Sequence, residues 1–234
     1  MSKIISDSLK SFKVAYLDAV VRSGAIHVAS SIDSRFTLRS GDISWIYVDH
    51  GEILCNPENG IPFVRMLYEY LRQEFSPSST VLVNVDSKAS PQEVGALAFH
   101  GGYRQILVNA DDTTIAEKGI NKRVRMPETK PGDQLVIVDD VLTKGTTVAA
   151  VVELVRQQLQ EEHQFHLIVG MARTPQIAVP LLEDVGVTSI SWFIELPDIL
   201  FRVWSDFSDA QRKGLLVEFP TLQKDLDILK GGVA

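Results

Sequence analysis

The feature of this sequence that most constrains its fold is a regular alternation, between residues 80 and 194, of short apolar runs and segments with helical spacing. Short apolar runs of this length are typical of buried strands, and the segments between them repeat apolar residues every three or four positions. The runs are TVLVNV (80–85), RQILVN (104–109), LVIVDD (135–140), FHLIVGMA (165–172) and TSISWFI (188–194), and the helical segments are PQEVGALAFH (91–100), TTVAAVVELVRQQLQ (146–160) and TPQIAVPLLEDV (174–185). Strands that alternate with helices form right-handed crossovers. The sequence therefore predicts an α/β fold with a mainly parallel central sheet and helices on both faces.

The chain before and after this region follows other patterns. A helix is predicted over residues 7–23, with Asp7 as its cap and Gly24 as its stop, and a second helix over 60–74. Two short strands, FTLR (36–39) and WIYVDH (45–50), are joined by a turn, and residues 196–230 have a helical pattern. We predict an N-terminal, hood-like elaboration over residues 1–75, packed on an α/β core that spans residues 76–234.

Composition excludes several classes of function. The formal net charge of −7 argues against a nucleic-acid-binding protein, whose domain is normally basic. The single cysteine, Cys55, rules out an internal disulfide framework and fits a reducing compartment. The charged start of the chain lacks the apolar core of a secretory signal, and no stretch approaches the ~20 apolar residues of a membrane span. We expect a cytoplasmic protein without a membrane partner.

Residues 136–147, VIVDDVLTKGTT, are the strongest candidate for a binding site. An apolar strand ends at two adjacent acids, Asp139 and Asp140, although like charges side by side disfavour each other. Ligands of open α/β sheets lie beyond the carboxyl ends of the strands, where these acids are expected. Two carboxylates at that edge can accept hydrogen bonds from the hydroxyls of a vicinal diol.

The residues that follow the acids suit a phosphate. Backbone N–H groups at the start of the helix near Thr146 favour an anion, and Gly145 lets the backbone approach it closely. The hydroxyls of Thr143, Thr146 and Thr147 add donors. A phosphate at one end and a diol at the other describe a ribose 5-phosphate. A capped strand-to-helix turn, a magnesium site and a generic nucleotide site remain alternatives, whereas the GxxxxGK[ST] pattern of a Walker loop is absent.

VIVDDVLTKGTT closely resembles the signature with which type I phosphoribosyltransferases bind 5-phosphoribosyl 1-pyrophosphate (PRPP). The resemblance implies the fold of that family. It also implies that Asp139 and Asp140 hold the ribose hydroxyls and that residues 143–147 hold the 5-phosphate. The implied PRPP contacts are Ser87, Lys88, Asp139, Asp140, Val141, Leu142, Thr143, Lys144, Gly145, Thr146 and Thr147. The implied catalytic residues are Lys88, Asp139 and Asp140.

Three further segments resemble orotate phosphoribosyltransferases within that family. In FTLRSGDISWIYVDHG (36–51), Arg39 takes the place of a lysine that reaches the substrate or pyrophosphate. In VDSKASP (85–91), Lys88 matches a lysine of the pyrophosphate loop. In VGMARTPQ (169–176), Arg173 falls where these enzymes bind the substrate carboxylate, with which an arginine can pair through two hydrogen bonds. Arg39 and Arg173 are therefore the implied base-binding residues.

One region departs from that family. Orotate enzymes carry a basic mobile loop with a histidine, and here the corresponding region, residues 109–133, begins with NADDTT and contains no histidine. Lys118, Lys122, Arg123 and Arg125 lie further along and either substitute for the basic run or form an ordinary solvated cluster. Closure of such a loop excludes water and places cations on the leaving group.

The resemblance as a whole implies transfer of ribose 5-phosphate from PRPP to a nucleobase, with orotate favoured, to give orotidine 5′-monophosphate and pyrophosphate. It implies Mg²⁺ bound together with PRPP, no dedicated protein metal ligands, and a homodimer. The five histidines are scattered and are interpreted as structural or solvated. The alternatives are a type I transferase for another base and a PRPP-binding regulatory protein with weakened catalysis.

Overall fold

A computed structural model describes residues 2–4, 9–38, 41–85, 90–108 and 124–231 of the chain. The strands are β1 (Ser2–Ile4), β2 (Ile26–Val28), β3 (Phe36–Thr37), β4 (Ile43–Ser44), β5 (Ile46–Val48), β6 (Thr80–Val85), β7 (Arg104–Val108), β8 (Val124–Arg125), β9 (Gln134–Leu142), β10 (Gln164–Ala172) and β11 (Val187–Glu195). The α-helices are α1 (Lys10–Ser23), α2 (His50–Cys55), α3 (Pro57–Glu74), α4 (Ser90–Gly101), α5 (Thr146–Arg156), α6 (Pro175–Asp184), α7 (Leu196–Arg202), α8 (Asp209–Glu218) and α9 (Thr221–Gly231).

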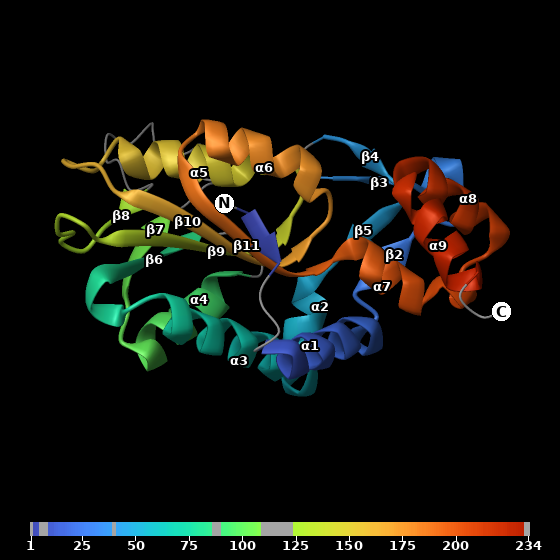
Figure 1. The fold of residues 1–234 in the computed structure, drawn as a ribbon, viewed down its shortest axis with the longest axis horizontal. Helices are drawn as coiled ribbons and strands as arrows, with labels where there is room; N and C mark the ends of the chain where they lie inside the picture. The colour runs from blue at the N-terminus through green and yellow to red at the C-terminus, as the bar shows by residue number, and fades with distance from the viewer. Residues whose placement is uncertain (1, 5–8, 39–40, 86–89, 109–123, 232–234) are drawn as a thin grey trace.

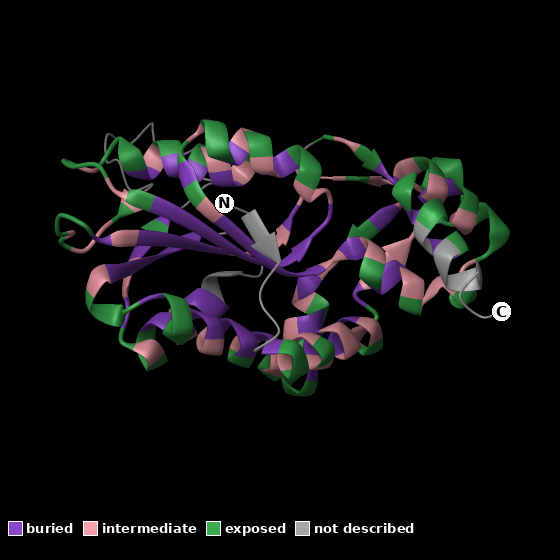
Figure 2. Ribbon diagram, viewed as in Figure 1, coloured by how far each residue is buried: buried purple, intermediate pink, exposed green. Residues whose placement is uncertain are grey.

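A central seven-stranded sheet organises the described part of the chain, in the order β1-β11-β10-β9-β6-β7-β8. Every neighbouring pair is parallel except β7 and β8, which are antiparallel. The interior strands are purple along most of their length in Figure 2, and all six residues of β6 are buried. Strands buried on both faces need continuous apolar sequence, which is why the five apolar runs became strands. The predicted α/β class with a mainly parallel sheet is confirmed.

Helices cover both faces of this sheet (Figure 1). On one face, α5 and α6 bury residues such as Val151, Val152 and Leu182 against the strands. On the other face lie α1, α3 and α4, and the core there includes Phe63 and Leu67 of α3. Their amphipathic spacing buries one stripe of each helix, and area removed from water is the main driving force for this packing.

A smaller group of elements lies at one end of the molecule, where β2 to β5 meet the C-terminal helices α7, α8 and α9 (Figure 1). Two antiparallel pairs form here, β2 with β5 and β3 with β4. The segment predicted as helical over residues 196–230 forms α7, α8 and α9. The proposed division into residues 1–75 and 76–234 stays a prediction.

The structure differs from the sequence predictions at several places. β1 adds a parallel strand outside β11, and β8 adds a short antiparallel strand beside β7; neither was predicted. β2, which pairs with β5, was not predicted either, and β4 lies in the segment predicted as a turn. His50 does not end a strand but begins α2, because the Asp49 carboxylate accepts a hydrogen bond from the backbone N–H of Gly51 and caps that helix. α1 begins at Lys10, and Asp7, the predicted cap, lies outside the described residues.

The predicted stop of the first helix is confirmed, since Gly24 caps α1 in the left-handed conformation with φ 76°. Among the described residues, no helix combines the length and the apolar character needed to cross a membrane.

Candidate functional site

The order of the strands reverses between β6 and β9. From β6 the chain crosses to β7 on one side, and it then returns to β9 on the other side and continues through β10 to β11. At such a reversal the two connecting segments leave the sheet in opposite directions and leave a crevice at the carboxyl ends of the strands. The segment 139–147 begins within β9 and continues past its carboxyl end, and in the sequence residues 86–89 come directly after β6.

The two acids lie in the C-terminal half of β9. Asp139 and Asp140 are both half-buried. Oδ1 of Asp139 accepts a hydrogen bond from the backbone N–H of Asp140 at 3.0 Å, and Oδ1 of Asp140 accepts one from that of Val141 at 2.7 Å. These contacts fix each carboxylate against its own strand, so that hydrogen-bond acceptors are held near the carboxyl end of β9.

The loop after β9 ends at Gly145, which precedes the first residue of α5. Gly145 has φ 80°, in the left-handed region that glycine adopts without strain. A Cβ built on it would lie 3.0 Å from Leu182 Cγ of α6, so a larger residue would also require Leu182 to shift. Thr146 is exposed and Thr147 is half-buried at the start of the helix, where free backbone N–H groups favour an anion.

The loops after β9 and β10 are joined. The backbone N–H of Arg173 donates to the carbonyl of Leu142 at 2.8 Å, and the Thr174 hydroxyl donates to the carbonyl of Thr143 at 3.2 Å. β9 extends to Leu142. The Leu142 side chain is buried in the core, whereas Val141 is half-buried. The predicted PRPP contacts at 139–147 therefore form one continuous segment, braced by the residues that follow β10.

The Lys144 side chain extends from this loop and contacts the N-terminal region. Its Nζ lies 2.7 Å from Oδ2 of Asp42 and 2.8 Å from Oδ1, with both side chains about two-fifths exposed. Asp42 precedes β4. The ion pair joins the candidate phosphate loop to the β3–β4 pair, although exposed pairs of this kind contribute little stability.

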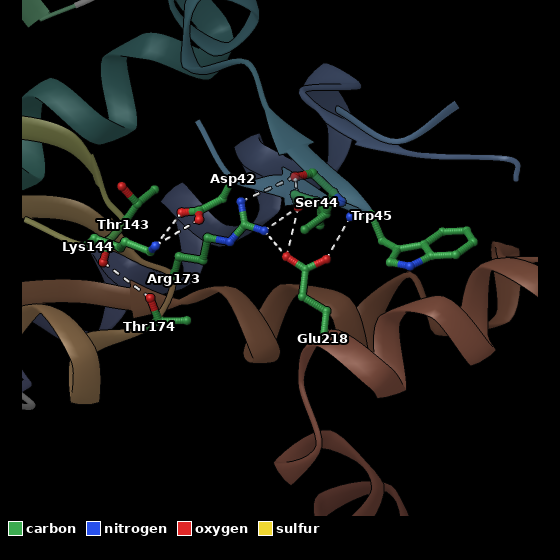
Figure 3. A network of polar contacts seen from close by, with 9 residues as sticks. Asp42, Ser44, Trp45, Thr143, Lys144, Arg173, Thr174 and Glu218 are labelled. Atoms are coloured by element: carbon green, nitrogen blue, oxygen red, sulfur yellow. Dashed lines mark hydrogen bonds and ion pairs between the residues drawn. The ribbon is translucent and has the colours of Figure 1, made fainter. Parts of the chain in front are cut away.

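Arg173 is buried and lies in a network that Figure 3 shows from close by. Its Nη1 donates to the carbonyl of Ile46 at 3.3 Å, and its Nη2 donates to Oγ of Ser44 and to Oε1 of Glu218. The guanidinium carbon also lies 5.6 Å from the centre of the Phe219 ring. The predicted base-binding arginine therefore has a carboxylate of its own chain as a partner.

The remaining predicted site residues lie outside the described parts of the chain. These are Arg39, Ser87, Lys88 and most of the 109–133 loop, of which residues 124–133 are described. Their assignments stay predictions.

Sequence reasoning missed a buried polar cluster near Asp140. Tyr16 Oη is hydrogen-bonded to His50 Nε2 at 3.1 Å, and His50 Nδ1 lies 3.6 Å from Glu93 Oε1. Gly170 of β10 makes room for it, because a Cβ there would lie 2.7 Å from Tyr16 Oη and 3.0 Å from the Asp140 carbonyl oxygen. A polar residue in the first turn of an otherwise apolar helix, as in PQEVGALAFH, was the only signal of Glu93 in the sequence.

The acids of β9 influence this cluster electrostatically. Burial, together with the negative charges of Asp140 and Asp139, raises the pKa of Glu93 from 4.5 to about 9. Burial also raises the pKa of Tyr16, with Glu93 and Asp140 adding to the effect. Burial lowers the pKa of His50, against the opposing charges of Asp140 and Asp49. At neutral pH, Glu93 is therefore protonated and His50 is neutral.

Comparison of the sequence with models of known protein families and with curated proteins finds no match. Comparison of the structure with solved structures finds clear likenesses. An orotate phosphoribosyltransferase from Aeropyrum pernix is 23% identical, with a TM-score of 0.61 over 81% of this chain and 99% of that chain.

Two more solved structures show the breadth of the likeness. The UMP synthase of Leishmania donovani is 19% identical, with a TM-score of 0.67 over 91% of this chain and 43% of that longer chain. An adenine phosphoribosyltransferase from the same organism is 16% identical, with a TM-score of 0.56 over 85% of this chain and 84% of that chain. At these identities, what is shared is the fold.

Proposed function

Because this chain has the type I phosphoribosyltransferase fold, we propose that it transfers the ribose 5-phosphate of PRPP to a nucleobase and releases pyrophosphate. The observation that supports this proposal most directly is the position of residues 139–147. The segment combines two carboxylates with a glycine–threonine loop, and it lies where the strand order of the sheet reverses. Neither a capped turn nor a generic nucleotide site requires both features together.

In the proposed complex, the 5-phosphate lies against the backbone N–H groups at the start of α5, and the hydroxyls of Thr143, Thr146 and Thr147 donate to it. Asp139 and Asp140 accept hydrogen bonds from the two ribose hydroxyls. The nucleobase nitrogen forms its bond to C1 of the ribose as the bond to pyrophosphate breaks, and both electrons of that bond leave with the pyrophosphate. The N–H proton of the base leaves to solvent or to the released pyrophosphate, and positioning and charge stabilisation supply most of the rate. Ser87 and Lys88 are the proposed contacts of the leaving pyrophosphate.

Mg²⁺ is the proposed cofactor, and it would neutralise charge on the pyrophosphate. No protein residue is proposed as a dedicated metal ligand: Asp139 and Asp140 would hold the ribose hydroxyls, and the hard oxygen atoms that Mg²⁺ prefers would come from the substrate and water. Mg²⁺ also keeps several waters and binds through substrate phosphates more often than through a protein cage. The protein's contribution is therefore to orient the ribose oxygens beside the metal-bound diphosphate.

The acceptor base has two candidates. Orotate is the acceptor implied by the resemblance at Arg39, Lys88 and Arg173, and two of the similar structures are an orotate phosphoribosyltransferase and a UMP synthase. A base without a carboxylate is the second candidate, favoured by the contact between Arg173 and Glu218. A homodimer stays a prediction, to be tested by light scattering of the purified chain.

The proposal is tested by measuring PRPP binding in the presence of Mg²⁺ by calorimetry, followed by initial rates with orotate, uracil, adenine and guanine. We expect micromolar PRPP binding and pyrophosphate release with one of these bases. PRPP binding without turnover of any base would favour the alternative of a PRPP-binding regulatory protein. Absence of PRPP binding would contradict the proposal as a whole.

A further inference from the structure

We infer that Glu218 takes the hydrogen-bond donors of Arg173 that an acidic base would need, so that the acceptor is a nucleobase without an ionised group. This inference rests on the proposed transferase function and specifies the class of its second substrate. It makes Glu218 a specificity-determining residue, which acts on the substrate through Arg173.

The surroundings of Arg173 leave it committed to its own chain. Its side chain is 8% exposed. Both partners of Nη2, the Ser44 hydroxyl and the Glu218 carboxylate, come from elements outside the β10 strand that Arg173 follows. Nη1 adds a third contact, to the Ile46 carbonyl. A buried arginine paired in this way with a carboxylate has the interaction that a substrate carboxylate would otherwise supply.

The Glu218 carboxylate is held by three groups rather than by one. Oε1 lies within hydrogen-bond distance of Arg173 Nη2 and at 2.8 Å from Ser44 Oγ, and Oε2 accepts from the backbone N–H of Trp45 at 2.7 Å (Figure 3). Both oxygens of the carboxylate are therefore engaged. The side chain is only 21% exposed, so it is largely shielded from the water that could replace these contacts.

The helix that carries Glu218 is fixed in place. Gly214, one turn earlier in α8, packs against the indole of Trp45 so closely that a Cβ would lie 2.2 Å from Trp45 Cδ2. Gly214 is buried, and Leu215 beside it is fully enclosed in the core. Because the helix backbone is anchored at both points, Glu218 can leave Arg173 only by rotating its own side chain, which gives up all three contacts.

The charge balance at this point disfavours a second carboxylate. The Arg173 cation is already matched by the Glu218 anion, so an orotate carboxylate would either lie beside a like charge or displace Glu218. Displacement would leave a largely buried carboxylate without its cation, which is strongly unfavourable. A neutral base brings no charge and leaves the pair intact. Discrimination here therefore works by repulsion of the wrong substrate.

The same pattern recurs at the neighbouring loop. Lys144 pairs with Asp42, as Arg173 pairs with Glu218. Both cations follow strands of the central sheet, and both carboxylates come from the elements packed against its end. Within the described residues, these two cations at this edge are thus already paired inside the chain.

The test uses two pairs of ligands that differ only in the carboxylate. The first pair, orotate and uracil, is compared through kcat/KM with PRPP and Mg²⁺, with adenine and guanine included. The second pair, orotidine and uridine 5′-monophosphates, is compared by calorimetry, which needs no turnover. We expect wild-type protein to favour neutral bases and their nucleotides at least tenfold over the orotate forms. The Glu218→Gln variant should shift each orotate-to-neutral ratio at least tenfold toward orotate.

Glu162→Gln, which removes an exposed carboxylate at the opposite edge of the sheet, is the matched control and should leave both ratios unchanged. Circular dichroism and PRPP affinity verify that each variant is folded. Wild-type preference for orotate or its nucleotide, or an unchanged ratio in folded Glu218→Gln protein, would overturn the inference while leaving the transferase proposal intact. If the wild-type protein does not bind PRPP, the proposed function on which the inference rests is itself contradicted.

Discussion

Oε1 of Glu93 lies 3.6 Å from Nδ1 of His50, and both side chains are almost completely buried. Within the described residues, neither carboxylate oxygen of Glu93 has a hydrogen-bond partner. A charged carboxylate in such a place would be costly, which is why Glu93 retains its proton.

The first prediction concerns stability at alkaline pH. The pKa of Glu93 is raised from 4.5 to about 9, so the folded protein holds a proton that the unfolded chain releases between these values. The free energy of unfolding should therefore fall as the pH rises from 7 to 9, a range above the ordinary pKa of histidine. Glu93→Gln should remove most of that fall and stabilise the protein at pH 8 by about 1–3 kcal/mol. Urea unfolding at each pH measures this.

The titration of His50 also changes the free energy of unfolding with pH, so its effect must be separated from that of Glu93. Burial lowers the pKa of His50, so its contribution to stability is present above about pH 6.5 and is lost at lower pH. Measurements at pH 7 and above therefore isolate Glu93, with Glu162→Gln as the control. An equally steep fall in the Glu93→Gln protein would show that another group causes it.

The second prediction concerns the acids of β9. Replacing both Asp139 and Asp140 by asparagine should weaken PRPP binding about 100-fold, because two charge-assisted hydrogen bonds to the ribose are lost. The fold should persist, since an asparagine Oδ1 can still accept the backbone hydrogen bonds that the acids accept now. Calorimetry and circular dichroism measure the two effects, with exposed Asp184→Asn as the control. Normal PRPP affinity in the double variant would mean that the ribose lies elsewhere.

The third prediction separates backbone strain from steric exclusion at the phosphate loop. Gly132 and Gly145 have nearly the same φ, 82° and 80°, but only Gly145 has a neighbour within reach of an added Cβ. Gly132→Ala should cost about 1 kcal/mol from strain alone, and Gly145→Ala about 2–3 kcal/mol. Only Gly145→Ala should also weaken PRPP binding. Equal costs for the two variants would argue that Leu182 moves aside freely.

The fourth prediction is a coupling energy. Arg173→Met should destabilise the protein by about 3 kcal/mol, because it leaves Glu218 largely buried without its cation. In the double variant with Glu218→Gln, the loss should be smaller than the sum of the single losses by at least about 1.5 kcal/mol. The exposed pair Arg156–Glu153 provides the control cycle, with an expected coupling below about 0.5 kcal/mol. Additive losses at Arg173 and Glu218 would show that the pair contributes nothing.

The sequence predicted the strands and helices of the central sheet because their signals are local. The run TVLVNV corresponds to β6 residue for residue, and the pattern over 146–160 contains α5. β1, β2, β4 and β8 were missed because each has only two or three residues, too few for a period of two to be visible. His50 was misplaced because WIYVDH continues the β-branched character of a strand, whereas the capping role of Asp49 depends on the backbone that follows.

At the candidate site, the sequence could not identify which side chains form hydrogen bonds or ion pairs with one another. Asp139, Asp140 and Gly145 could be assigned to the edge of the sheet, because a strand and a helix on either side determine where a short loop lies. The partner of Arg173 could not be predicted from the sequence, because Glu218 is 45 residues away and contacts Arg173 only through the packing of α8. The sequence around an arginine at the end of a strand does not reveal whether the carboxylate that pairs with it belongs to a ligand or to the chain itself.

The reversal of strand order between β6 and β9 also has a consequence for folding. Among the strands from β6 to β11, the pairs β6–β7, β9–β10 and β10–β11 join segments close in the chain, whereas the register of Thr80 with Gln134 joins segments further apart. Forming that junction carries the larger loop-closure entropy, so it should lag behind those three pairs during refolding. The competence to bind PRPP would then emerge only in the slowest kinetic phase, after the helical signal has already recovered.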